Sequence, residues 1–164
     1  MQEATVGQDK RKVVSLLDSL SIFRQFSEND FNRLLDTAKL QSYKPKEIII
    51  KEGDYNNLVF FLINGSLVVI KDGNNLALLD QDGELFGEMG VLNNEPRSAT
   101  IQAEKSSLVL CIDASIMKDK ESKDAIIFSH ILYRLFAEIL STRLRVMIEE
   151  NSRLKKENEL LKNR

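Results

Sequence analysis

Residues 82–101 read DGELFGEMGVLNNEPRSATI, and this stretch is the most informative part of the chain. It lies between two apolar runs, and Glu88 to Leu92 is long enough for about one helical turn. The free backbone N–H groups at the start of such a turn attract an anion, and Gly87 lets the backbone approach it closely. Arg97 adds a planar, permanently charged set of donors that matches phosphate oxygens. The stretch therefore predicts a site for a phosphate group.

Glu88 lies within the same turn, where its carboxylate would repel an anion unless it faces another group. The natural partner is a hydroxyl donor, such as the 2′-hydroxyl of a ribose. The alternative interpretation is that Glu88 and Arg97 form an ion pair that braces the loop around a vestigial site.

The composition is that of one compact domain of ordinary size with an added helical segment. The 164 residues carry 23 basic and 25 acidic side chains, so no global field would draw the protein to nucleic acid or to an anionic membrane. Cys111, the single cysteine, lies in an apolar run and is expected to be a buried structural thiol. The N-terminus lacks a signal-peptide pattern and the longest apolar runs are too short to span a bilayer, which predicts a cytoplasmic protein without membrane insertion.

Short apolar runs separated by turn residues begin at Leu40 and recur about every ten residues. Strands this short, with tight turns and no helices between them, favour an antiparallel sandwich or barrel over a parallel sheet. The predicted strands are Glu47–Lys51, Leu58–Ile63, Ser66–Lys71, Leu76–Leu79, Ser98–Ala103 and Ser107–Ile112.

Helical patterns flank this region on both sides. Apolar residues before residue 40 recur at helical spacing, and from Lys123 onward the chain has no Gly or Pro. We therefore predict an α+β fold in three parts: an N-terminal helical segment (1–39), an antiparallel β-roll or jelly-roll barrel (40–115), and a long C-terminal helix (116–164).

The end of this helix carries a heptad repeat. Its residues are spaced alternately by 4 and 3 in the order Leu140, Leu144, Met147, Asn151, Leu154, Asn158 and Leu161. Leu and Met at position d with Asn at position a favour a parallel dimeric coiled coil, because opposed Asn side chains hydrogen-bond across a dimer. Glu150 and Glu157 at g would face Lys155 and Lys162 at e of the partner helix. The sequence thus predicts a homodimer; the alternative is a solvated amphipathic helix that packs within its own chain.

The segment Phe86-Gly87-Glu88, followed by Pro96-Arg97-Ser98-Ala99-Thr100, resembles the phosphate-binding cassette of the cyclic nucleotide-binding domain family, which includes catabolite activator protein. Upstream, Lys51-Glu52-Gly53-Asp54 and Phe60-Phe61-Leu62-Ile63-Asn64-Gly65 are similar to the family's early barrel strands and their turn glycines. The resemblance covers roughly Phe23 to Arg145 and implies a cyclic nucleotide ligand.

The resemblance also implies roles for the cassette residues. Arg97 would pair with the cyclic phosphate, Glu88 would accept the ribose 2′-hydroxyl, and the backbone of Gly87 and Ala99 would line the sugar-phosphate. Ser98 lies where members of the family differ in nucleotide preference, and a hydroxyl there occurs in both cGMP-binding and cAMP-binding members. Ser98 therefore does not decide the ligand; cAMP is expected, with cGMP as the alternative. The predicted cassette consists of Phe86, Gly87, Glu88, Met89, Arg97, Ser98 and Ala99.

In this family, part of the lid over the base comes from the helix after the barrel. By position, Leu144, Met147 and Ile148 are the expected apolar contacts of this lid. Met147 is also assigned to the coiled-coil seam, and a role in the seam alone is the alternative.

The predicted function is a non-enzymatic cyclic nucleotide sensor that reports to an effector protein through its helix dimer. No catalytic pair and no metal site are found in the sequence. One alternative is an adaptor that acts through its coil while its site is vestigial. Another is a fragment of an activator-type transcription factor; a helix-turn-helix domain would then follow the long helix, but the sequence ends at Arg164, so no nucleic-acid partner is expected.

Overall fold

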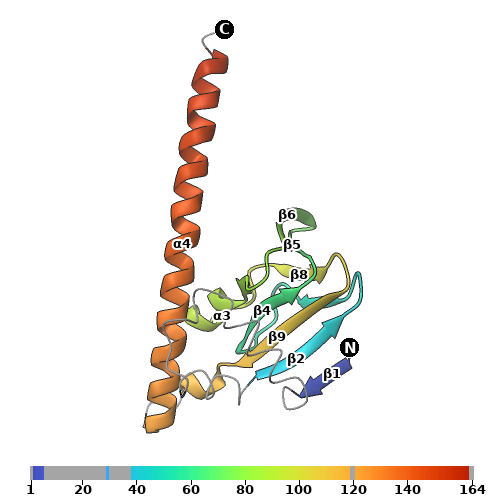
Figure 1. The fold of residues 1–164 in the computed structure, drawn as a ribbon, viewed down its shortest axis with the longest axis vertical. Helices are drawn as coiled ribbons and strands as arrows, with labels where there is room; N and C mark the ends of the chain where they lie inside the picture. Colours follow the sequence, from blue (N-terminus) through green and yellow to red (C-terminus); the bar gives the residue numbers. More distant parts are fainter. Residues whose placement is uncertain (1, 6–28, 30–37, 119–120, 163–164) are drawn as a thin grey trace.

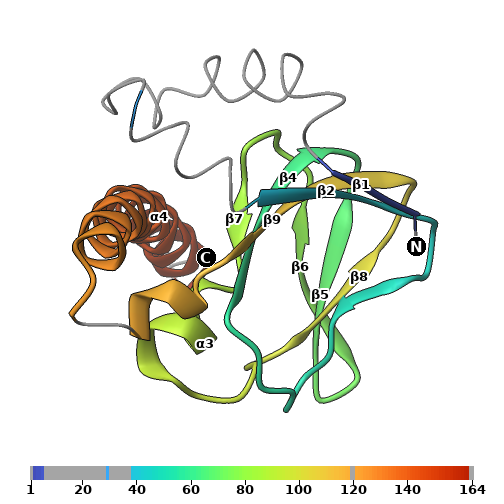
Figure 2. The ribbon, with the colours of Figure 1, turned by 90° about the horizontal axis from the view of Figure 1, so that it is seen from below.

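Two antiparallel sheets face each other, and a long helix packs on the outside of the larger one (Figure 1). The computed structural model describes residues 2–5, 29, 38–118 and 121–162. The strands are β1 (Gln2–Thr5), β2 (Ala38–Tyr43), β3 (Ile48–Ile50), β4 (Leu58–Asn64), β5 (Leu67–Lys71), β6 (Asn74–Leu79), β7 (Leu85–Phe86), β8 (Thr100–Ala103) and β9 (Ser107–Asp113). The helices are α3 (Glu88–Asn93), the 3-10 helix η2 (Ser115–Lys118) and α4 (Lys123–Lys162). One sheet has the order β1-β2-β9-β4-β7 and the other the order β3-β8-β5-β6, and Figure 2 shows both from below.

Strand β4 is apolar at almost every position because both of its faces are buried. Alternate side chains of a strand point to opposite faces of the sheet. Val59 and Phe61 therefore pack toward α4, whereas Phe60 and Leu62 pack between the two sheets. Strand β9 alternates in the same way, and its Cys111 lies in the core between the sheets, which confirms the predicted buried thiol. Two cores thus share the same pair of strands.

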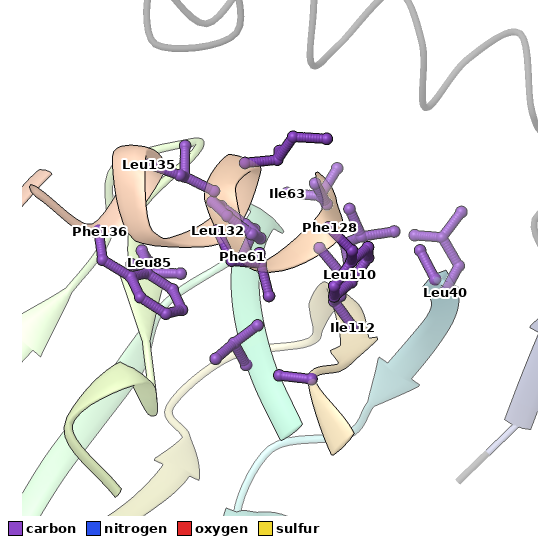
Figure 3. Close-up of a cluster of buried hydrophobic side chains, with 14 residues drawn as sticks. Leu40, Phe61, Ile63, Leu85, Leu110, Ile112, Phe128, Leu132, Leu135 and Phe136 are labelled. Carbon is purple, nitrogen blue, oxygen red and sulfur yellow. The ribbon is translucent and has the colours of Figure 1, made fainter. Parts of the chain in front are cut away.

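The first turns of α4 close the outer core (Figure 3). The helix has more apolar residues here than one narrow stripe requires, and these residues cover the outer face of the five-stranded sheet. The buried helix residues of this core are Phe128, Ile131, Leu132, Leu135 and Phe136, and they meet Phe61, Leu85, Leu110 and Ile112.

The predicted antiparallel roll and the C-terminal helix from Lys123 are confirmed. Strands β2 and β7 were not predicted. The prediction that residues 1–39 are helical is wrong at both ends, because Gln2–Thr5 form β1 and Ala38 begins β2. β1 pairs with β2 and so satisfies backbone groups along what would otherwise be the edge of the sheet. The predicted helices within residues 6–28 and 30–37 lie outside the described residues.

Beyond the barrel, α4 continues as an uninterrupted helix that extends away from both sheets (Figure 1). Within Ala125–Lys162 one window of 18 residues has a mean hydropathy of 1.3, with 33% of it buried. By length and composition this helix could cross a membrane, contrary to the expectation that no apolar run is long enough. A core helix of a soluble protein meets the same criterion.

Because α4 is anchored by its buried leucines, Leu132→Ala is expected to lower the free energy of unfolding by about 2–5 kcal/mol. Leu132 has 0% exposure, so its truncation leaves a cavity in the outer core. The control is Leu160→Ala, since Leu160 is 71% exposed on the same helix and its change should cost less than about 0.5 kcal/mol. Urea denaturation measures both variants, and equal losses would contradict this account of the core.

Candidate functional site

The cassette begins where β7 ends, at a point fixed by ring packing. Phe86 lies opposite Phe60 in the β4–β7 pair, and their rings stack with centroids 5.2 Å apart. Gly87 follows at a φ of 83°, a left-handed conformation that favours glycine, and caps α3. A Cβ atom at Gly87 would lie 3.0 Å from Nη1 of Arg97 and 3.1 Å from Cδ2 of Phe60. The strand, the glycine and Arg97 are therefore packed as one unit.

Arg97 is held at both its backbone and its side chain. Its backbone N–H donates to the carbonyl of Asp54, and its own carbonyl accepts from Gly53, both at 2.9 Å. Nη1 donates to the carbonyl oxygen of Gly87, and Nη2 donates to Asn56 Oδ1 and to the carbonyl oxygen of Leu58. The guanidinium also lies over the Phe60 ring, with Cζ 5.9 Å from its centroid. These contacts fix a guanidinium that is only 3% exposed.

Nε of Arg97 is buried and has no hydrogen-bond partner among the described residues. A buried donor that lacks an acceptor costs about 1–3 kcal/mol, more when it is charged. Burial lowers the pKa of the Arg97 guanidinium, and the charge of Glu88 acts in the opposite direction. The site thus holds a buried cation whose Nε atom lacks an acceptor, which suits an incoming anionic oxygen.

Glu88 pairs with an arginine of the long helix. Nη1 of Arg143 lies 3.1 Å from Oε1 of Glu88, which is only 4% exposed, and Nη2 donates to the carbonyl oxygen of Leu85. Within the described part of the chain, Oε2 of Glu88 has no hydrogen-bond partner. Arg143 therefore offsets the carboxylate charge while one oxygen is left to accept another donor.

A cavity of about 300 Å³ opens between these groups, at the small end of the range for small-molecule sites. Its charged lining consists of two guanidinium groups, Arg97 and Arg143, and two carboxylates, Glu84 and Glu88. The apolar wall of the cavity is formed by Ile50, Val69, Leu79 and Ile101. The cavity thus combines a charge-balanced set of polar groups with an apolar wall, and this combination suits a ligand that has both an anionic group and an apolar ring.

The structure brings the predicted cassette together around this cavity. Its lining includes Phe86, Gly87, Glu88, Met89, Arg97, Ser98 and Ala99. The predicted lid residues Leu144, Met147 and Ile148 do not line it. They line a separate groove on α4 and are 59%, 66% and 57% exposed. The helix contributes Arg143 to the cavity instead, because α4 passes beside α3 at that level (Figures 1 and 2).

Sequence reasoning did not assign a role to Asn56, Glu84 or Arg143. Arg143 directly precedes the predicted lid residue Leu144, and its partner Glu88 is 55 residues away in the chain. Asn56 lies in the loop before β4, where nothing in the sequence distinguishes it from other turn residues. For Arg143, the available clue was a basic residue one turn after the last apolar contacts of α4.

Residues 40–123 match the cyclic nucleotide-binding domain. The chain belongs to this family. The family assignment agrees with the cavity, which is lined by a buried guanidinium and a buried carboxylate.

This cyclic nucleotide-binding domain is similar to parts of two curated relatives and to one solved structure. It is 36% identical over 91 residues to a cGMP-dependent protein kinase of Plasmodium berghei (strain Anka), covering 56% of this chain and 10% of the kinase. It is 28% identical over 106 residues to the cAMP-dependent protein kinase type II regulatory subunit of Drosophila melanogaster, covering 65% of this chain and 28% of the subunit. The structure of Sp-2Cl-cAMPS bound to PKAR CBD2 superposes with a TM-score of 0.63 at 30% identity, covering 88% of this chain and 94% of that one. The chain therefore spans only a small part of the length of these curated relatives.

Gly87→Ala is expected to destabilise this cyclic nucleotide-binding domain more than Gly73→Ala does. Both glycines have a φ near 80°, so both changes introduce backbone strain of about 1 kcal/mol or more. Only at Gly87 would the new methyl group also press on Arg97 and Phe60, since nothing lies within 4 Å of a Cβ at Gly73. Urea denaturation measures the free energy of unfolding of both variants. An equal decrease in Gly87→Ala and Gly73→Ala would contradict the tight packing of the cassette.

Burial raises the pKa of the Glu84 carboxyl, and the charge of Arg143 acts in the opposite direction. A carboxyl with a raised folded-state pKa favours folding below its unfolded pKa and loses this contribution as the pH rises through the folded value. Glu84→Gln is therefore expected to raise the free energy of unfolding at pH 7, with the gain vanishing below about pH 4. Urea denaturation across this pH range measures it, with the exposed change Glu149→Gln as control. A gain that does not vary with pH would contradict the burial effect.

Proposed function

We propose that this domain is a non-enzymatic sensor that binds a cyclic nucleotide, cAMP in preference to cGMP, in the cavity beside α3. The observation that carries the proposal is the buried Nε of Arg97, a charged donor without an acceptor in the described residues. A phosphate oxygen would supply that acceptor. The family match and the analogue-bound structural neighbour support a cyclic nucleotide as the ligand.

The remaining groups of the ligand match the other parts of the cavity. Oε2 of Glu88 would accept the ribose 2′-hydroxyl, while Arg143 holds Oε1 and offsets the negative charge next to the phosphate. Without Arg143, a carboxylate beside a phosphate would repel the ligand. The apolar wall, which includes Val69 and Leu79, would receive the base. Each part of a nucleoside cyclic phosphate thus has a counterpart in the site.

We further propose that Arg143 couples the ligand to α4. The ribose and Arg143 would bind the same carboxylate, so ligand binding changes the free energy of the contact between the helix and the cassette. By linkage, whatever binds the helix must change nucleotide affinity by the same factor. The output would be an effector protein that acts on a homodimer formed through the C-terminal helix.

The proposed location is the cytoplasm, without membrane insertion. The most apolar part of α4 supplies Phe128, Leu132 and Phe136 to the outer core, so insertion would expose the sheet that these residues cover. We propose no nucleic-acid partner, because 23 basic residues against 25 acidic ones give no net positive charge to attract phosphate backbones.

A second candidate function is an adaptor whose site is vestigial. It is favoured by the protein's own contacts, because both terminal nitrogens of Arg97 and one oxygen of Glu88 already have partners within the chain. In this case the coil alone would carry the activity. The two candidates differ in whether nucleotide binds at all.

Titration calorimetry with cAMP and with cGMP tests the proposal. We expect micromolar or tighter binding, stronger for cAMP, that Arg97→Ala weakens on the order of a hundredfold, because the variant removes the charged partner of the phosphate. Glu88→Gln is the second variant, since it preserves the shape of the side chain while removing the charge.

Arg145→Ala is the control, since Arg145 is an exposed arginine on α4 that does not line the cavity. Circular dichroism verifies that each variant is folded. If Arg97→Ala does not fold, the nucleotide affinity of Glu88→Gln tests the site instead. No heat with either nucleotide on the wild-type protein would support the adaptor instead.

A further inference from the structure

A second groove of about 370 Å³ lies on α4 beyond the barrel. It is lined by Leu144, Met147, Ile148, Asn151, Ser152 and Lys155. Apolar side chains that are more than half exposed, several together, mark a surface that another protein covers. The groove includes the three residues that the sequence analysis assigned to the ligand lid.

The groove has the composition of a hole in a parallel coiled coil. In such a coil each d side chain inserts between four residues of the facing helix, at positions a, d, e and the next a. In the heptad repeat of α4, Leu144, Met147, Ile148 and Asn151 occupy these four positions in this order. The side chain that fits the hole is therefore Met147 of a second helix with the same sequence and register.

The charges beside the seam select a parallel orientation. In a parallel pair, Glu150 and Glu157 at g face Lys155 and Lys162 at e of the other helix. In an antiparallel pair, g faces g and e faces e, which would oppose Glu to Glu and Lys to Lys. The groove is thus complementary to another copy of α4 that runs in the same direction.

We propose that a second copy of this chain docks in the groove, in parallel and in register, and that its Ile148 packs on the aliphatic stem of Arg143. Arg143 occupies position g of the first seam heptad, and the facing e residue is Ile148 of the partner subunit. The same Arg143 holds Glu88 in the ligand cavity. The dimer therefore orients the arginine that positions the ribose-binding carboxylate, and Leu144, Met147 and Ile148 serve the seam rather than the base. The link to ligand affinity rests on the proposed function, whereas the docking does not.

Disulfide cross-linking of the full chain tests the docking without any nucleotide. Leu160 and Leu161 are 71% and 68% exposed, and they occupy positions c and d. Leu161→Cys should cross-link in a glutathione redox buffer at least about tenfold more than Leu160→Cys, because only d residues meet across a parallel seam. The wild-type protein, whose Cys111 is buried, is the background.

An antiparallel pair would separate the two Leu161 positions by about 30 Å and give no cross-link. Equal cross-linking at both positions, or a monomer or a trimer by light scattering, would overturn the docking.

The second arm measures cAMP and cGMP affinity in the cross-linked Leu161→Cys dimer, where the two helices cannot separate. Ile148→Ser should weaken binding on the order of fivefold, because it removes the support of Arg143. Val146→Ser is the matched control, since Val146 is 56% exposed against 57% for Ile148 and occupies the outer position c. Unchanged affinity in Ile148→Ser would overturn the contact with Arg143. Failure of the cross-linked wild-type sequence to bind either nucleotide would instead overturn the proposed function and leave the docking result standing.

Discussion

The arrangement of the cassette depends on the need to bury one guanidinium. Arg97 cannot lose its charge inside the protein, so its burial requires hydrogen-bond acceptors around it. Gly87 turns its carbonyl oxygen toward the side chain, the loop before β4 supplies Asn56, and the Gly53–Asp54 turn fixes the backbone. Two stretches of the chain, residues 53–56 and Gly87, thus meet at Arg97. These groups leave Nε of Arg97 without an acceptor, and this is the donor proposed to bind the phosphate.

The five-stranded sheet and α4 are linked through β7, whose two residues contribute to both cores. β7 places Leu85 in the core under α4 and Phe86 in the core between the sheets. Glu88 follows two residues after Phe86, as the first residue of α3. The carbonyl oxygen of Leu85 also accepts a hydrogen bond from Arg143. A shift of the cassette would therefore move both the packing and the polar contact that hold the helix.

Local patterns predicted much of this structure, and long-range contacts account for what they missed. The cassette could be predicted because its chemistry lies within one short stretch, from Gly87 to Arg97. Strand β7 was missed because it has only two residues and is recognisable only by its pairing with β4. The pair of Arg143 with Glu88 joins residues 55 positions apart, and no periodicity specifies it. Leu144, Met147 and Ile148 could be assigned to either a lid or a seam from sequence, and the structure puts them away from the cavity.

The 40 residues of α4 form one helix from the outer core to the end of the heptads, without a glycine or proline at which it could bend. From Arg143 to Lys162 it extends about 28 Å at 1.5 Å per residue. It therefore behaves as a lever arm whose fulcrum lies at the barrel. A tilt of about 10° there displaces the far end by roughly 5 Å, by the geometry of a rigid rod of this length. A change beside Glu88 that tilted the helix by this angle would thereby produce its largest displacement at the tip.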